Sequence, residues 1–221
     1  MDLEQLLAPQ SPERRHHVKK FFLGLLIVVI GLGLVLGLAW VSSYGSLNSS
    51  NQAVLKAAAD IDSTLQRRSD LIPNLVATVQ GYATHEETVF KEVTEARAKV
   101  GQLNLKVSDV IGDPEKMKAL QAAESSLQGA LSRLLLVTEN YPQLRAAEGF
   151  RDLQTQLEGT ENRINVARGT YNKEVANHNV NVNGLFSGFV ARQHGFHEAT
   201  YFNADEAAKV APKVNFGGGK P

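Results

Sequence analysis

One stretch of this 221-residue chain has residue types and spacing that could bind a metal, His194-Gly195-Phe196-His197-Glu198. Two histidines three positions apart on a helix can share a zinc ion, with the glutamate as a third ligand. A metal held in this way would support hydrolysis. Because Gly195 weakens the helix that the spacing requires, we favour the simpler interpretation of exposed loop histidines and expect no metal.

The other common catalytic patterns are missing from the sequence. There is no cysteine, no G-x-S-x-G turn, no H-E-x-x-H and no phosphate-binding G-x-x-x-x-G-K-[ST]. His85 and His178 stand alone and are interpreted as helix-surface or network histidines. The 23 basic side chains balance 23 acidic ones, which leaves no basic footprint for nucleic acid. We therefore predict a protein that is not an enzyme, has no cofactor and binds no nucleic acid.

Polar residues crowd around Pro73. A proline inside a helix frees the carbonyl four residues earlier, at Ser69, and an Arg or Asn side chain can satisfy it. We interpret the cluster as an interhelical polar network that specifies how the helices pack. The alternative is a binding site for a carboxylate or a peptide. The expected members are Asp62, Arg67, Arg68, Asp70, Asn74, Arg163 and Arg168, with the last two arginines pairing with Asp62 or Asp70.

Helical periodicity surrounds the polar cluster. Apolar residues recur three or four positions apart from Leu55 to Val79, which predicts a helix with a kink near residues 69–72. Further helices are expected over about 84–100, 114–139 and 145–182, and the pattern dissolves after Asn183. The pair Asp113-Pro114 is typical of a helix start.

These stripes predict an all-α fold, because each amphipathic helix must bury one face. The expected architecture is a single N-terminal transmembrane helix followed by an antiparallel bundle of about four long helices. The bundle domain is placed at residues 52–216 and a flexible tail at 217–221.

The predicted transmembrane helix is the run from Phe21 to Val41, which contains no ionisable side chain. At about 1.5 Å per residue its length is roughly 30 Å, the thickness of the hydrocarbon core of a bilayer. A cleaved signal peptide would have a shorter apolar region ending in small residues. Since this run ends in Ala39-Trp40-Val41, we predict an uncleaved membrane anchor.

The charges beside the anchor predict its orientation. Basic residues near a membrane helix stay on the cytoplasmic side, and after the apolar run the first one is Lys56. Residues 1–20 are thus a cytoplasmic tail and the bundle is extracytoplasmic, which in a bacterium means the inner membrane and periplasm. Residues 42–51, rich in Ser, Asn and Gly, form a juxtamembrane segment, for which a hinge and a continuous helix both fit. The basic side chains before the run are Arg14, Arg15, Lys19 and Lys20.

Two further sets of residues predict association. Gly33 and Gly37 form a G-x-x-x-G pattern inside the anchor, where small residues let helix backbones approach each other in lipid. We therefore expect a homo-oligomer. A dense aromatic set is expected outside the helices, where it caps the bundle or forms an interaction patch. Its members are Phe186, Phe189, Phe196, Tyr201 and Phe202.

Three separated motifs carry a family resemblance: QRRSDLIPNLV at residues 66–76, TENRINVAR at 160–168 and APKVNF at 211–216. With them the chain resembles the LemA family from about Ala53 to Phe216. The resemblance implies long antiparallel helices, a single membrane helix and an extracytoplasmic body. It implies no settled enzymatic activity and no agreed ligand, and the family's genes often stand beside those of membrane-bound proteases. Here Phe186 is followed by Ser187, where family members usually carry Phe-Pro.

The function expected from these observations is a membrane-anchored, non-enzymatic scaffold that self-associates and holds partners at the membrane. The alternative is a sensor of a ligand or of the state of the envelope, coupled to a membrane partner such as a protease. An apolar cavity among the helices would favour the sensor, and a closely packed bundle would favour the scaffold.

Overall fold

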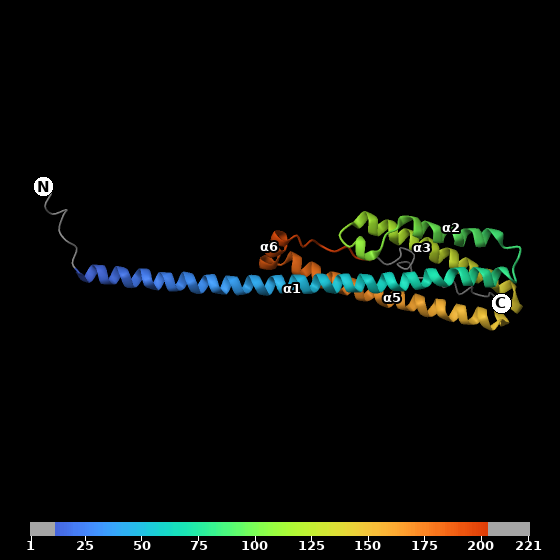
Figure 1. Cartoon of the computed structure of the whole chain (residues 1–221), viewed down its shortest axis with the longest axis horizontal. Coiled ribbons are helices and arrows are strands. Elements are labelled where there is room, and N and C mark those ends of the chain that lie inside the picture. Colours follow the sequence, from blue (N-terminus) through green and yellow to red (C-terminus); the bar gives the residue numbers. More distant parts are fainter. Residues whose placement is uncertain (1–11, 203–221) are drawn as a thin grey trace, which may run out of the picture.

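The computed structural model describes residues 12–202 and confirms the all-α prediction, because these residues form helices and no strand (Figure 1). Predictions on residues 1–11 and 203–221, including the tail and the APKVNF motif, lie outside the described residues. The α-helices are α1 (Pro12–Gln80), α2 (Glu87–Leu103), α3 (Pro114–Val137), α4 (Pro142–Ala146), α5 (Glu148–Asn183) and α6 (Leu185–His194). Short 3-10 turns, η2 (Val107–Asp109) and η3 (Thr138–Asn140), join them.

The dominant element is α1, a single helix of 69 residues. At 1.5 Å per residue it is about 100 Å long, and its first half extends away from the other helices (Figure 1). It runs through residues 42–51, so the juxtamembrane segment is helical and contains no hinge. It also continues past Pro73 to Gln80, so the proline does not end it.

Contacts with distant parts of the chain account for this continuity. Ser and Gly have low helix propensity, yet Leu47 is fully buried against Val190 and Ala191 of α6. The Ser50 hydroxyl lies 3.0 Å from Nδ1 of His178 on α5. Packing of this face therefore stabilises a helix that its own composition would leave marginal, and the packed region begins before residue 52.

The bundle consists of two helix pairs. The second half of α1 lies along α5, and α2 lies along α3 (Figure 1). Apolar side chains between the pairs form two main cores. The core near the far end of α1 contains Ile72, Leu75, Val79, Phe90, Val93, Leu131, Leu134 and Phe150. The core nearer the N-terminal half contains Val54, Ile61, Val107, Met117, Leu120, Tyr171, Val175 and Phe202.

The start of α3 is as predicted. The Asp113 carboxylate accepts a hydrogen bond from the backbone N–H of Lys116 at 3.1 Å, and Pro114 occupies the first turn. This hydrogen bond lowers the pKa of the Asp113 carboxyl. The predicted ends of α3 and α5, near Glu139 and Val182, also agree with the structure to within two residues.

The prediction that helical structure dissolves after Asn183 is wrong, because α6 follows at once. Gly188 lets α6 approach the end of α5 closely, since a Cβ at position 188 would lie 2.8 Å from the carbonyl oxygen of Val182. Phe186 and Phe189 therefore lie on a helix and not outside the helices, as had been expected.

Residues 195–202, here called the strap, run from α6 back along α5. Gly195 ends α6 in the left-handed conformation, with φ of 72°. Two asparagines of α5 each exchange a pair of hydrogen bonds with the strap backbone, Asn179 with Ala199 and Asn172 with Phe202, at 2.8–2.9 Å. Because these contacts satisfy backbone groups, they hold the strap without requiring regular structure in it.

Candidate functional site

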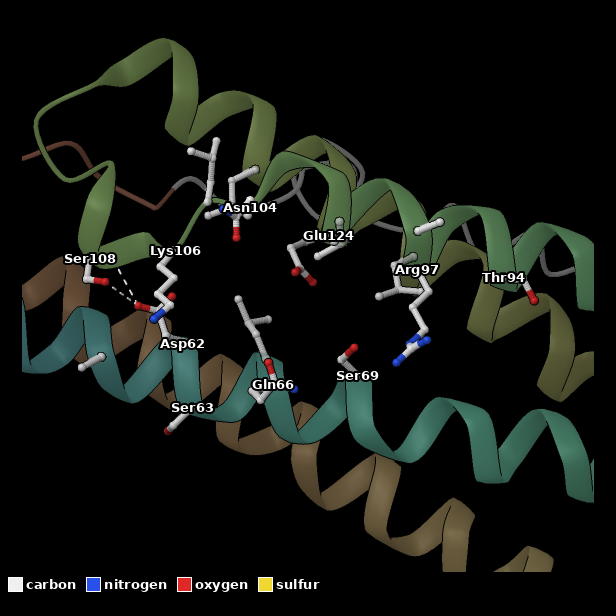
Figure 2. A pocket seen from close by; sticks show the side chains of 18 residues that line it. Asp62, Ser63, Gln66, Ser69, Thr94, Arg97, Asn104, Lys106, Ser108 and Glu124 are labelled. Atoms are coloured by element: carbon white, nitrogen blue, oxygen red, sulfur yellow. Dashed lines mark hydrogen bonds between the residues drawn. The ribbon is translucent and has the colours of Figure 1, made fainter.

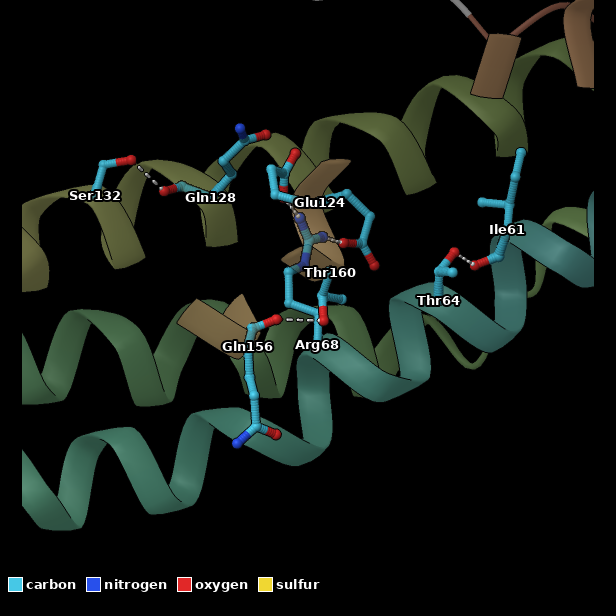
Figure 3. Close-up of polar contacts among 9 residues, drawn as sticks. Ile61, Thr64, Arg68, Glu124, Gln128, Ser132, Gln156 and Thr160 are labelled. Carbon is cyan, nitrogen blue, oxygen red and sulfur yellow. Dashed lines mark hydrogen bonds and ion pairs between the residues drawn. The ribbon is translucent and has the colours of Figure 1, made fainter. Parts of the chain in front are cut away.

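The most deeply buried charge in the described residues is Arg68 of α1, whose side chain is 1% exposed. It forms an ion pair with Glu124 of α3, which is 3% exposed (Figure 3). Its Nη1 atom donates to Glu161 of α5 at 3.2 Å. We call these three residues the ion cluster. It joins three helices at the level where one apolar core gives way to the other.

Burial sets the protonation of the ion cluster. Loss of hydration raises the pKa of the Glu124 carboxyl, and the attraction of Arg68 opposes this without cancelling it. A raised pKa means that the folded protein binds this proton more tightly than the unfolded chain does. The ionised form of Glu124 is therefore held at a cost in stability.

This cost predicts a pH dependence. Because the folded pKa of Glu124 lies above its ordinary value of 4.5, its contribution to stability is full below pH 4.5 and is lost as pH rises through the folded pKa. Glu124→Gln removes this titration. We expect the unfolding free energy of the variant, relative to wild type, to increase between about pH 4.5 and pH 8, as measured by urea unfolding in detergent.

The control for this experiment is Glu139→Gln, since Glu139 is exposed. Its unfolding free energy should follow that of the wild type at every pH. A difference between Glu124→Gln and wild type that stays constant with pH would show that Glu124 does not titrate differently in the folded protein.

Beside the ion cluster, a groove of about 750 Å³ opens between α1 and the α2–α3 pair (Figure 2). Glu124 lines it from α3, and Arg97 of α2 extends toward α1 near Ser69. The charged lining of the groove consists of the exposed basic side chains Arg97 and Lys106 and the acidic side chains Asp62 and Glu124. Its larger apolar lining residues are Leu65, Val100, Leu105, Leu120 and Leu127. A groove of this size and composition could take a small amphiphilic ligand.

Asp62 shapes one end of the groove. Its carboxylate accepts from the backbone N–H of Val107 at 2.7 Å and from both the N–H and the hydroxyl of Ser108, at 3.3 and 2.9 Å. Asp62 therefore holds the turn η2 in place. The nearby Tyr171 hydroxyl has a raised pKa, mainly because of burial and also because of the Asp62 charge.

The structure disperses most of the predicted polar network. Arg67, Asp70, Asn74 and Arg163 are exposed, and Asp70 accepts from its neighbour Gln66 at 2.7 Å. The Arg168 guanidinium lies over the Phe202 ring, 4.5 Å from its centroid.

The partners of Arg68 were missed by the sequence reasoning. Glu124 and Glu161 were not expected in the polar network, and they are the residues that pair with this arginine. A signal was present for one of them, because Glu124 is a carboxylate at a position of the apolar stripe of α3.

The histidines near the C-terminus are engaged separately. His194 packs on Trp40 and Tyr44, with ring centroids 5.9 and 4.8 Å away. Glu198 accepts a hydrogen bond from Asn183. Across residues 20–202, no three His, Asp or Glu side chains gather closely enough to hold a metal ion. His178 is buried, and its Nε2 atom lies 3.0 Å from the carbonyl oxygen of His197 in the strap.

The predicted aromatic set divides into two groups. Phe202 is buried in a core, while Tyr201 is exposed. Phe186 and Phe189 pack on Trp40 of α1, with centroids 6.4 and 5.9 Å away. The remaining member, Phe196, packs on Tyr44. These three side chains therefore pack on α1 at the end of its apolar segment.

Before Ala39, that apolar segment makes no contact with the rest of the described residues that would bury it. Side chains from Phe21 to Leu38 are exposed, and nothing lies within 4 Å of a Cβ built on Gly33 or Gly37. Among the described residues, α1 is the one helix long and apolar enough to cross a membrane.

The fold and the ion cluster define an all-α helical-bundle protein with one candidate membrane helix. The sequence model of the LemA family matches residues 57–216, and the chain belongs to this family.

Three relatives illustrate the similarity. Magnetosome protein MamQ of Magnetospirillum gryphiswaldense is 26% identical over 168 residues, which cover 68% of this chain and 62% of MamQ. Magnetosome protein MamQ 2 of Paramagnetospirillum magneticum is 27% identical over 158 residues, covering 65% and 58%. Protein LemA of Metamycoplasma hominis is 21% identical over 193 residues, covering 87% and 83%. The chain therefore spans about six-tenths of the length of the MamQ proteins.

Proposed function

We propose that this protein is a membrane-anchored, non-enzymatic scaffold that self-associates and holds partners at the membrane. The observation that supports this most strongly is the unbroken α1, which joins an exposed apolar segment to the core of the bundle in one helix. An anchor and a bundle on one rigid helix cannot move independently, as a tethered enzyme could. The ion cluster suits this function, because it specifies how three helices pack.

The orientation that we propose places residues 1–20 in the cytoplasm and the bundle on the opposite side of the membrane, because the basic residues precede the apolar segment. In a bacterium this is the inner membrane with the bundle in the periplasm. The partner that we propose is another membrane protein, such as a membrane-bound protease.

Self-association is proposed to use the glycine face of the anchor. Replacing Gly33 and Gly37 together by isoleucine fills the face along which a second helix would approach. We expect the fraction of crosslinked dimers and larger species to fall at least several-fold in native membranes, as measured by chemical crosslinking and immunoblotting.

The matched control for this experiment is Gly24→Ile. Gly24 lies nine positions before Gly33, which is two and a half helical turns and therefore the opposite face. It is equally free of contacts, so its replacement should leave the crosslinking pattern unchanged. If the double variant crosslinks as the wild type does, the glycine face does not mediate association.

The groove favours a second candidate function, the sensing of a ligand. The Asp62 and Glu124 carboxylates of its lining already have partners. The exposed Arg97 and Lys106 and the leucine side chains therefore fit a peptide end that carries a carboxylate and apolar side chains. Such a ligand would bridge α1 to the α2–α3 pair beside the ion cluster. Binding of the ligand would therefore change how firmly the bundle holds α1, the helix that also contains the anchor.

We expect acetyl-trileucine with a free carboxylate to bind the full chain saturably in equilibrium dialysis. Loss of a charged hydrogen bond costs about 1.5–3 kcal/mol, so Arg97→Gln should weaken binding about tenfold or more. Arg133→Gln is the control, because Arg133 is an exposed arginine that pairs with Glu92 and does not line the groove. Equal binding of the methyl ester would argue against carboxylate recognition, and the absence of saturable binding would argue against the sensor.

A further inference from the structure

Helix α6 presents an apolar face that the described part of the chain leaves partly exposed. Leu185 is fully exposed, and Phe186 and Phe189 are 38% and 49% exposed. The opposite side of the helix is buried, with Val190 and Ala191 packed on Leu47. We call Leu185, Phe186 and Phe189 the α6 apolar face.

The position of α6 along α1 places this face beside the end of the apolar segment. Phe186 and Phe189 contact Trp40, the penultimate residue of the apolar segment that ends at Val41. The buried side of α6 contacts Leu47, about 10 Å further along α1. The polar interface on each side of a bilayer is about 5–8 Å thick. A membrane that surrounds residues 21–41 would therefore place the α6 apolar face at the level of its headgroups.

The residue types of α6 fit this level of the membrane. Aromatic side chains concentrate at the membrane–water interface, where their rings meet both acyl chains and water. Arg192 lies seven positions after Leu185, on the same side of the helix, and is exposed. Its long side chain can reach lipid phosphates while the apolar residues enter the acyl boundary. This pattern is typical of helices that lie in the plane of the interface.

We propose that α6 is an interfacial helix whose apolar face inserts into the leaflet on the bundle side, so that the protein contacts the membrane at a second place beside its anchor. This inference rests on the proposed membrane anchor. A second copy of the chain is a poorer occupant, because a stable protein interface needs about 20–30 residues on each side, whereas the α6 apolar face offers three. The face is also continuous, through Trp40, with the lipid-facing segment itself.

The chain provides clean probes for this proposal, since it has no cysteine and a single tryptophan, Trp40. Leu185→Cys is labelled with the environment-sensitive dye NBD, and the full chain is reconstituted in vesicles of phosphatidylcholine and phosphatidylglycerol. We expect blue-shifted emission and at least twofold quenching by lipids that carry a spin label near the headgroup. The control is Val166→Cys on α5, which is also an exposed apolar site and should give water-like, unquenched emission.

The outcomes separate this proposal from the anchor on which it rests. Quenching of Trp40 by brominated lipids reports the anchor, so a quenched Trp40 with an unquenched, water-like dye at position 185 would overturn the inference alone. Loss of both signals would overturn the anchor as well. Blue-shifted emission without lipid quenching would show that protein covers the α6 apolar face, and it would equally overturn the lipid proposal.

Discussion

Replacing Arg68 by methionine is expected to lower the free energy of unfolding by about 3–5 kcal/mol, the cost of leaving a buried charge without its partner. For a chain of this size that corresponds to a fall in Tm on the order of 10 °C. Glu124 is the residue left unpaired, because it is 3% exposed. Without the guanidinium its pKa rises further, so the loss should be larger at pH 8 than at pH 5. Thermal unfolding of the full chain in detergent, followed by circular dichroism, measures both effects.

Two other variants show whether the effect comes from the ion cluster. Arg67→Met is the same change at the exposed neighbouring position and should stay within about 0.5 kcal/mol of wild type. The double variant Arg68→Met with Glu124→Leu replaces the buried pair by apolar side chains and should regain most of the lost stability. If Arg68→Met and Arg67→Met unfold alike, the ion cluster does not hold the three helices together.

Introducing aspartates at Leu26 and Ile30 is expected to release the protein from membranes. Each charge near the centre of a membrane helix costs about 2.5–3.5 kcal/mol on the insertion scale. The pair therefore costs about 5–7 kcal/mol, which is roughly 10³·⁵- to 10⁵-fold in partitioning. Both side chains are exposed, so their replacement removes no contact within the bundle. The measurement is the fraction of protein that stays in the membrane pellet after alkaline carbonate extraction.

The control places the same charges elsewhere. Val166 and Val180 of α5 are exposed apolar residues, and their double replacement by aspartate should leave the protein in the membrane pellet. Retention of the Leu26 and Ile30 double variant in the pellet would mean that residues 21–41 do not anchor the protein.

The helices were predictable where one face is regularly apolar and the start is marked by a cap. The stripe of α5 from Phe150 to Val182 and the Asp113-Pro114 start of α3 are local patterns, and the structure contains both. Periodicity reports which face of a helix is buried. It does not report how each helix is rotated or shifted against its neighbours.

That limit explains why the partners of the polar residues were not predicted. Arg68 was placed in a network, but its partners depend on which turn of α3 and α5 lies opposite α1. Glu124 lies among the buried apolar positions of α3 and Glu161 lies within the TENRINVAR motif, and only the packed bundle brings them together. Asp62 was expected to face an arginine, whereas it accepts hydrogen bonds from a turn 45 residues away.

The same limit explains why the helical structure of α6 and of the juxtamembrane segment was not predicted. Glycines at 184, 188 and 195 resemble helix breakers in sequence, yet Gly188 lets α6 approach the end of α5 closely. Residues 42–51 have a composition typical of a hinge, and their contacts with α6 and α5 keep them helical. In both places tertiary contacts override local propensity.

The continuity of α1 also determines how far each part of the bundle lies from the end of the apolar segment. Because α1 is one continuous helix through residue 80, the groove near Gln66 lies roughly 35–40 Å along it from the end of the apolar segment, and Gln80 roughly 60 Å. If the proposed anchor spans the membrane, α1 holds the groove at this distance from the lipid. A membrane partner of the groove would then need a domain that extends as far, and a partner with a shorter domain would contact only the region near α6.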